Sequence, residues 1–174
     1  MRTLIISDTH GSLSAWKKAW DLAGNVEQVI HAGDVLYHGP RNPLPAGYDP
    51  AGLAAELHNL ETPLTWVRGN CDADVDLMVV GKGSPPASKL NINRHKVLIV
   101  HGHQPLPADA DYDLIISGHT HLPVLERKDG KVLLNPGSPA LPKENNPPSI
   151  AVWDAKGIKI LNLETGESMM ELAL

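Results

Sequence analysis

Five short apolar stretches along the chain each end in polar residues of the kind that bind metal ions. The stretches are rich in Val, Ile and Leu and cover residues 4–6, 29–30, 64–67, 97–100 and 114–116. Runs of this length and β-branched content are typical of buried strands. In open α/β sheets, ligands bind beyond the carboxyl ends of the strands. The pattern therefore predicts that the five polar clusters meet at one shared site.

The polar clusters combine carboxylate, imidazole and amide side chains. Asp8 and His10 lie two residues apart, and His119 and His121 repeat this spacing. Neutral imidazole together with carboxylate suits divalent Mn, Fe, Co, Ni or Zn. A thiolate-rich zinc site is excluded, because Cys71 is the only cysteine.

Asp34 and Asn70 suggest that the site holds two ions. The two oxygens of Asp34 could bridge two cations, and Asn70 offers a neutral oxygen ligand. Several imidazoles with few carboxylates favour two metals roughly 3.5–4 Å apart. With Asp8, Asp34 and a bridging hydroxide, such a centre carries a charge of about +1. It would attract a phosphodiester anion, and the hydroxide could attack phosphorus in line with the leaving oxygen.

The rest of the pattern predicts an α/β fold. Helices are expected from Ser12 or Ser14 through Leu22, with a stop at Gly24, and over residues 50–60. The second half instead carries paired strand patterns around turns at residues 93–95, 129–130 and 154–157. These patterns fit a three-layer sheet and a four-layer α/β/β/α sandwich of two mixed β-sheets flanked by helices about equally.

Composition limits the class of protein. A length of 174 residues predicts a single domain over residues 1–174. The net charge of -5, without a basic block, argues against non-specific nucleic-acid binding. A single cysteine excludes an intramolecular disulfide, and no apolar stretch approaches the ~20 residues that span a bilayer. A cytoplasmic location is therefore expected.

A proline-rich loop over residues 36–50 follows the Asp34 cluster. It is expected to lie over the mouth of the site, as a lid, as a rigid connection or as a contact in a homo-oligomer. Arg41 and His38 in this loop are candidates for substrate contact, as is His103 from the fourth cluster. Arg68 is expected to form a structural salt bridge rather than to bind phosphate.

The ordered motifs resemble the calcineurin-like binuclear metallophosphoesterases, and among them small bacterial phosphodiesterases. The resemblance rests on residues 8–10, 33–42, 69–72, 101–102, 118–121 and 135–138. It implies the four-layer sandwich and a ligand set in which Asp34 bridges both metals. The remaining ligands it implies are Asp8, His10 and His121 for the first metal, and Asn70, His101 and His119 for the second. Residues 135–138 are expected to brace the loop from His119 to His121.

One position departs from many relatives, which carry histidine after the Gly-Asn pair where this chain has Cys71. A neutral thiol is a weaker donor and a poorer general acid than imidazolium at neutral pH. Activated diesters should therefore be preferred over alkyl monoesters. Asp72, the next residue, is expected either to cap a helix or to orient its neighbours.

The sequence thus predicts a metal-dependent phosphodiesterase acting on a small phosphodiester. Two divalent ions are expected, with Mn ahead of Fe, Ni, Co and Zn, and Asn70, Cys71 and Asp72 are the candidate catalytic residues. One alternative is a non-catalytic binding scaffold, as in a subunit of the retromer coat that shares this fold. The other is a phosphomonoesterase or protein phosphatase.

Overall fold

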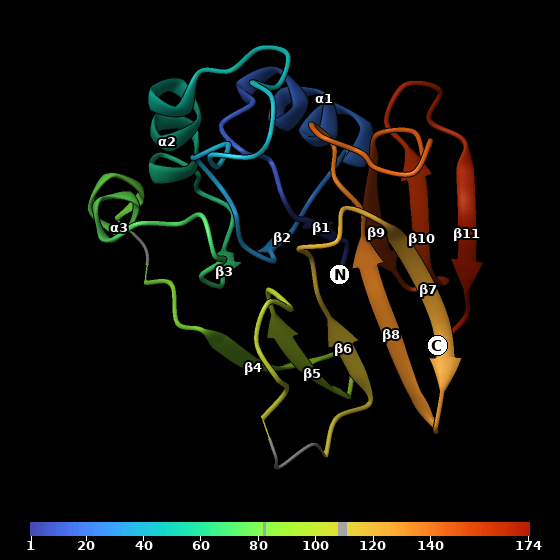
Figure 1. Ribbon diagram of the computed structural model, residues 1–174. Helices are drawn as coiled ribbons and strands as arrows, with labels where there is room; N and C mark the ends of the chain where they lie inside the picture. Colours follow the sequence, from blue (N-terminus) through green and yellow to red (C-terminus); the bar gives the residue numbers. More distant parts are fainter. Residues whose placement is uncertain (82, 108–110) are drawn as a thin grey trace.

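Two mixed β-sheets lie face to face, and the three helices found in the described part of the chain cover the first of them (Figure 1). The computed structural model describes residues 1–81, 83–107 and 111–174. The first sheet has the strand order β11-β10-β9-β1-β2-β3, and the second has the order β4-β5-β6-β8-β7. The helices are α1 (Leu13–Ala23), α2 (Pro50–His58) and α3 (Asp74–Val80). The strands are β1 (Thr3–Ile6), β2 (Gln28–His31), β3 (Leu64–Trp66), β4 (Ala87–Ile92), β5 (His95–Val100), β6 (Leu114–Ile116), β7 (Pro123–Lys128), β8 (Lys131–Pro136), β9 (Ser149–Asp154), β10 (Gly157–Asn162) and β11 (Ser168–Leu172).

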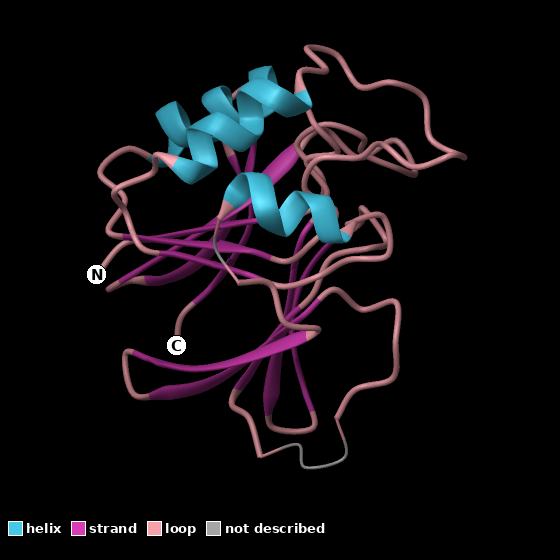
Figure 2. Cartoon of the chain, turned by 90° about the vertical axis from the view of Figure 1, so that its left-hand side faces the viewer, coloured by secondary structure: helices cyan, strands magenta, loops and turns pink. Residues whose placement is uncertain are grey.

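Alternation along the strands divides the core into layers. In β1, Leu4 and Ile6 pack with the helices, whereas Ile5 packs between the two sheets. Because successive side chains of a strand point to opposite faces, a fully apolar strand serves both layers. A smaller cluster that includes Leu98 and Ile115 lies on the other face of the second sheet. The predicted pair of mixed sheets flanked by helices is confirmed, and Figure 2 shows the described helices on one side of the molecule.

Parallel pairing places the carboxyl ends of the strands that precede the polar clusters side by side. β1, β2 and β3 run parallel, with Ile6 opposite His31 and His31 opposite Trp66. In the second sheet, β5, β6 and β8 also run parallel, with Ile99 opposite Ile116. The polar clusters that follow these strands therefore leave the two sheets at neighbouring positions.

Local signals fix the first helix. Ser12 accepts a hydrogen bond from the backbone N–H of Ala15, and Gly24 ends the helix with φ 73°. These residues match the expected cap and stop. The second helix starts at Pro50 as predicted and ends at His58, two residues early. None of the described helices is long and apolar enough to cross a bilayer.

Candidate metal centre

The loops after β1 and β2 are tied together by backbone hydrogen bonds. The N–H of Asp8 donates to the carbonyl of Gly33 at 3.0 Å, and the N–H of His10 donates to that of Asp34 at 3.1 Å. A link to the second sheet comes from His119, whose N–H donates to the Asp8 carboxylate at 2.9 Å. The predicted convergence of clusters from both sheets is therefore present in the structure.

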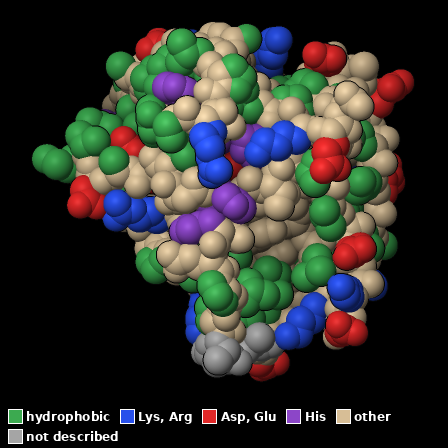
Figure 3. Space-filling view, viewed as in Figure 1, with side chains coloured by type: hydrophobic (Ala, Val, Ile, Leu, Met, Phe, Trp, Pro, Cys, Tyr) green, Lys and Arg blue, Asp and Glu red, His purple; other side chains and the backbone are tan. Residues whose placement is uncertain are grey.

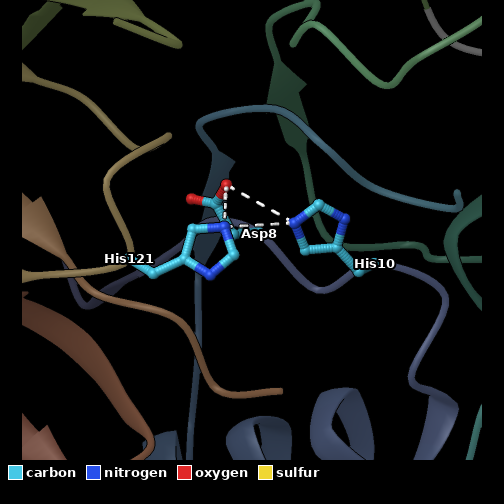
Figure 4. Close-up of side chains that lie close together, drawn as sticks. All are labelled: Asp8, His10 and His121. Atoms are coloured by element: carbon cyan, nitrogen blue, oxygen red, sulfur yellow. Dashed lines mark hydrogen bonds and ion pairs between the residues drawn. The ribbon is translucent and has the colours of Figure 1, made fainter. Parts of the chain in front are cut away.

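Three side chains form a tight group at the centre of this region (Figure 4). The Nε2 atoms of His10 and His121 lie 3.2 Å apart. Oδ1 of Asp8 lies 3.3 Å from Nε2 of His121 and 3.8 Å from Nε2 of His10. All three residues are buried, and Oδ1 of Asp8 has no hydrogen-bond partner among the described residues. A buried carboxylate oxygen without a hydrogen-bond partner destabilises the fold unless a cation binds it.

Backbone carbonyls set the tautomer of three histidines. Nδ1 of His10 lies 2.8 Å from the carbonyl oxygen of Tyr37, and Nδ1 of His121 lies 2.5 Å from that of Leu141. Nδ1 of His101 lies 2.7 Å from the carbonyl of Ala32. A carbonyl only accepts, so each Nδ1 carries the proton in the neutral ring. Each Nε2 lone pair is then free to coordinate a metal, as is usual for histidine ligands.

A second group surrounds Asp34. Its Oδ2 lies 3.3 Å from Nε2 of His101 and 3.9 Å from Nε2 of His10. Oδ1 of Asn70 lies 3.2 Å from Nε2 of His101. The ring of His119 lies 5.1 Å from that of His101, centroid to centroid, and its nitrogens have no hydrogen-bond partner within the described ranges. Asp34 thus lies between the two groups.

The charges of the group favour ionised carboxylates. Burial alone would raise the pKa of Asp34, but hydrogen bonding and charge from His101 and the Cys71 N–H hold it well below its ordinary value. The same balance lowers the pKa of Asp8, where His121 is the largest opposing partner. Burial opposes a charge on His101, yet Asp34 and Asp8 raise the pKa of its ring to about 9. Without a metal this ring therefore also carries a proton on Nε2 at neutral pH, and a bound cation would displace that proton. Two buried carboxylates that stay ionised form a binding site for cations, so the donor set fits divalent metal ions.

Five residues of this region have left-handed backbones. Positive φ angles between 47° and 70° occur at Asp8, His10, Asp34, His119 and His121. Side chains other than glycine adopt this region at a cost, and such residues gather at functional sites. All five donor residues thus lie in strained turns that follow the strands.

Asp72 holds the loops around Asp34 together. Its carboxylate accepts hydrogen bonds from the N–H groups of Asp34 (2.9 Å), Val35 (2.7 Å) and Gly69 (2.7 Å). Burial raises the pKa of this carboxyl to about 6, although the three donors oppose the shift. The helix-cap interpretation is wrong, since α3 begins at Asp74, two residues later, and its N-cap is Ala73. The orienting role is the one that the hydrogen bonds support.

Cys71 lies beside Asp34 but stays a neutral thiol. Its N–H donates to Oδ1 of Asp34 at 2.8 Å. Burial, followed by the nearby Asp34 carboxylate, raises the pKa of the thiol to about 12. Gly39 of the proline-rich loop packs against this side chain, because a Cβ built there would lie 2.9 Å from Sγ. The loop is therefore seated directly on the edge of the site.

The segment after β8 braces the loop that carries His119 and His121. Nδ2 of Asn135 donates to the carbonyl of Gly118 at 2.8 Å and to Oγ1 of Thr120 at 3.1 Å. The Ser138 hydroxyl donates to the carbonyl of Asp8 at 2.8 Å. The expected bracing contact is confirmed, and it reaches both sheets.

A pocket of about 720 Å³ opens over the centre and is lined by Asp34, Asn70, Cys71, His119 and His121. On the face in Figure 3, Lys and Arg side chains lie close to histidines near the middle of the molecule. Arg41 lines this pocket as expected, and so does Lys143, which the sequence pattern did not single out.

The other candidate contacts lie elsewhere. His38 is not among the residues that line the pocket, and its ring packs between those of Tyr37 and Tyr48. His103 lies beside His101, with ring centroids 5.3 Å apart, outside the pocket lining. Arg68 forms a 2.7 Å salt bridge with Asp74, as predicted. Substrate contact stays a prediction for all three residues, of which Arg41 is the one that lines this pocket.

Comparison with known proteins identifies the family. The sequence model of the calcineurin-like phosphoesterase superfamily domain matches residues 1–157. The chain belongs to this superfamily. It is 35% identical over 181 aligned residues to a protein named phosphodiesterase YfcE from Escherichia coli K12, covering 100% of this chain and 98% of the relative.

Solved structures support the same membership. The calcineurin-like fold of this chain superposes on the E. coli phosphoesterase YfcE with a TM-score of 0.93 at 35% identity, over 99% of both chains. An archaeal phosphodiesterase matches with a TM-score of 0.65 at 26% identity over the full length of both chains. Vps29 from Cryptosporidium parvum (TM-score 0.67, 23% identity, 99% of this chain and 98% of that one) shares the fold.

Proposed function

We propose that the chain is a metal-dependent phosphodiesterase with two divalent ions at the convergent site. The observation that carries the proposal is the set of three histidine rings whose Nδ1 faces a backbone carbonyl, so that Nε2 is the nitrogen directed toward an ionised carboxylate. The relatives named phosphodiesterases support the reaction class.

Each of the two ions would take ligands from both sheets. Asp8, His10 and His121 would hold the first ion, and their mutual distances of 3.2–3.8 Å suit one shared cation. The second ion would be held by Asn70, His101 and His119, with Asp34 shared between the ions. Mn is the foremost candidate, and Fe, Co, Ni and Zn suit the same ligands.

When bound, the ions would supply a nucleophile from water at neutral pH and neutralise charge on the phosphoryl oxygens. The residues of the chain set the geometry for this chemistry. The Cys71 N–H and the Asp72 carboxylate fix the loop that presents Asp34 and Asn70. Arg41 at the pocket edge would attract the anionic substrate.

Cys71 favours diesters with good leaving groups. A thiol with a pKa of about 12 is a poor proton donor to an alkoxide. Since the leaving oxygen receives little help from this position, substrates whose leaving group is stable as an anion should react fastest. We therefore expect aryl phosphodiesters to be better substrates than alkyl phosphomonoesters.

The test is hydrolysis by protein purified without chelator, after metal analysis. With added Mn, bis(4-nitrophenyl) phosphate should be hydrolysed faster than 4-nitrophenyl phosphate. Asp34→Asn should lower the rate by about 100-fold or more and reduce the bound metal per chain. The matched control is Asp129→Asn, because Asp129 also has a positive φ (51° against 56°) but lies in the exposed β7–β8 turn.

Two results would contradict the proposal. Full activity and full metal content in Asp34→Asn would refute the shared-ligand role. A metal-loaded chain that hydrolyses neither ester would instead favour the binding scaffold.

A further inference from the structure

Two cations from distant loops line the pocket above the candidate metal centre. Arg41 lies in the proline-rich loop after β2, and Lys143 lies in the loop between β8 and β9. Both side chains are exposed, and neither forms an ion pair with any residue that the structure describes. Glu144 follows Lys143 in the chain but does not line the pocket. Free cations at the same pocket stand out in a chain with a net charge of -5.

The two cations are anchored to the site itself. Gly39, two residues before Arg41, packs against Sγ of Cys71. Leu141, two residues before Lys143, accepts the hydrogen bond from Nδ1 of His121. Each loop is thus tied to one side of the centre by a contact that also positions a residue of the site. The places of the two cations are therefore set by the same contacts that build the centre.

The pocket is larger than one phosphoryl group requires. Its volume of about 720 Å³ lies in the range of pockets that enclose a drug-sized ligand. Asp34 is the one carboxylate in its lining, and it would be neutralised by the ions proposed above. Arginine presents a planar fork to phosphate oxygens, and lysine supplies a point charge. The outer part of the pocket is therefore suited to a compact anion.

We propose that Arg41 and Lys143 form a second anion subsite, so that the preferred substrate is a small phosphodiester that carries a further phosphoryl group on one of its alcohols. This inference rests on the proposed phosphodiesterase function. The scissile diester would lie over the metal centre, and the second phosphoryl group would lie between the two cations. The acidic net charge confines this attraction to the pocket and disfavours long nucleic acids.

The test compares two chromogenic substrates that differ only in the second charge. They are thymidine 5′-(4-nitrophenyl phosphate) and the same compound with a 3′-phosphate. For the metal-loaded wild type, kcat/KM should be about 10- to 100-fold higher for the 3′-phosphorylated substrate at low salt. This ratio should shrink as the salt concentration rises, because the cations are exposed.

Substitutions test whether Arg41 and Lys143 cause the preference for the 3′-phosphorylated substrate. Arg41→Gln and Lys143→Gln should each lower the ratio of kcat/KM values, and the double variant should bring it close to one. Arg94→Gln and Lys156→Gln remove exposed cations from turns outside this pocket and should keep the wild-type ratio.

The outcomes separate this inference from the proposed function. Hydrolysis of both substrates with equal efficiency would overturn the second subsite alone, as would a ratio that survives in the double variant. Failure of the metal-loaded wild type to hydrolyse either substrate would contradict the phosphodiesterase function itself.

Discussion

The Nε2 atoms of His10 and His121 face each other at 3.2 Å, and neither carries the ring proton. Their protons are assigned to Nδ1 by the hydrogen bonds to backbone carbonyls. Two lone pairs at this distance repel each other, whereas a cation between them converts the repulsion into coordination. A cation between these two rings therefore fits the geometry of the folded chain.

Metal removal should lower the thermal stability of the chain. A ligand that binds only the folded state at 100 times its Kd adds about 2.7 kcal/mol, which corresponds to about 5–11 °C in Tm at this size. Differential scanning calorimetry of EDTA-treated protein, with and without Mn, measures the shift. His121→Gln should lose most of the shift, whereas the exposed His58→Gln should keep it. An unchanged Tm with Mn, Co and Zn would contradict the metal site.

Cys71→His should change which leaving groups are tolerated. Imidazolium can protonate a departing alkoxide, whereas the half-buried thiol with a pKa of about 12 is a poor donor for this step. Rates for aryl diesters with leaving groups of rising pKa should fall less steeply in the variant, with the largest gain for the poorest leaving group. Parallel slopes for wild type and Cys71→His would refute the role assigned to this position. Cys71→Ser keeps a side chain of similar size and adds no imidazolium, so it should keep the steep slope.

His31 should make the metal-free chain sensitive to acid. Its Nε2 donates to Oγ1 of Thr9 at 2.9 Å, and its Nδ1 accepts the N–H of Gly33 at 3.2 Å. The Thr9 hydroxyl hydrogen is committed to the carbonyl of Val35, so the neutral ring completes the network. Burial lowers the pKa of His31 to about 3. In the unfolded chain the ring takes up its proton near pH 6.5.

The sign of the pH effect follows from this difference. The folded pKa lies below the unfolded one, so the contribution to stability is present above pH 6.5 and is lost as the pH falls from 6.5 toward 3. The loss should approach about 1.4 kcal/mol per pH unit. Urea unfolding of EDTA-treated wild type and His31→Gln between pH 7.5 and 5 measures this contribution as the difference between their free energies of unfolding. A constant difference in unfolding free energy between the two proteins would show that His31 does not contribute.

Asn135→Ala should weaken metal binding without removing a ligand. The amide donates to the buried carbonyl of Gly118 and to the hydroxyl of Thr120, and its loss removes both hydrogen bonds at a cost of about 1–3 kcal/mol. Loss of such support typically lowers metal affinity by about 10–100-fold. Calorimetric titration with Mn measures the affinity. The control is Asn146→Ala, since the Asn146 side chain donates to the backbone carbonyl of Lys143 and to no proposed metal ligand among the described residues. Lower stability with unchanged affinity would limit Asn135 to a structural role.

The strand ends could be predicted because burial and chemistry coincide there. Residues 4–6 and 114–116 are apolar at every position. A strand needs this pattern only when both of its faces are buried, as they are in β1 and β6. Helix α1 carried both a cap and a stop signal. The donors after these strands followed from the rule that ligands gather at carboxyl ends of parallel strands.

Other parts left weaker signals in the sequence. Helix α3 has seven residues, and its apolar Val75, Met78 and Val79 are exposed, so no helical stripe marks it. Strand β11 is an edge strand with half-exposed side chains and alternates poorly. The role of Asp72 depends on backbone groups from a different strand end, and Lys143 reaches the pocket only through tertiary folding. Contacts of this kind join segments that are distant in the chain, so the local sequence pattern does not predict them.

The left-handed residues of the centre also bear on how this architecture can change over evolutionary time. Glycine adopts positive φ without steric cost, so a glycine at any of the five positions would relieve the strain of its turn. At Asp8 and Asp34 the same change would leave the N–H groups of His119 and Cys71 without their acceptor, whereas the side chains of the three histidines do not support their own turns in this way. Without selection for the site, the histidine ligands should therefore be lost before the two carboxylates. A chain that still holds all five in strained turns is what continued use of the site would leave.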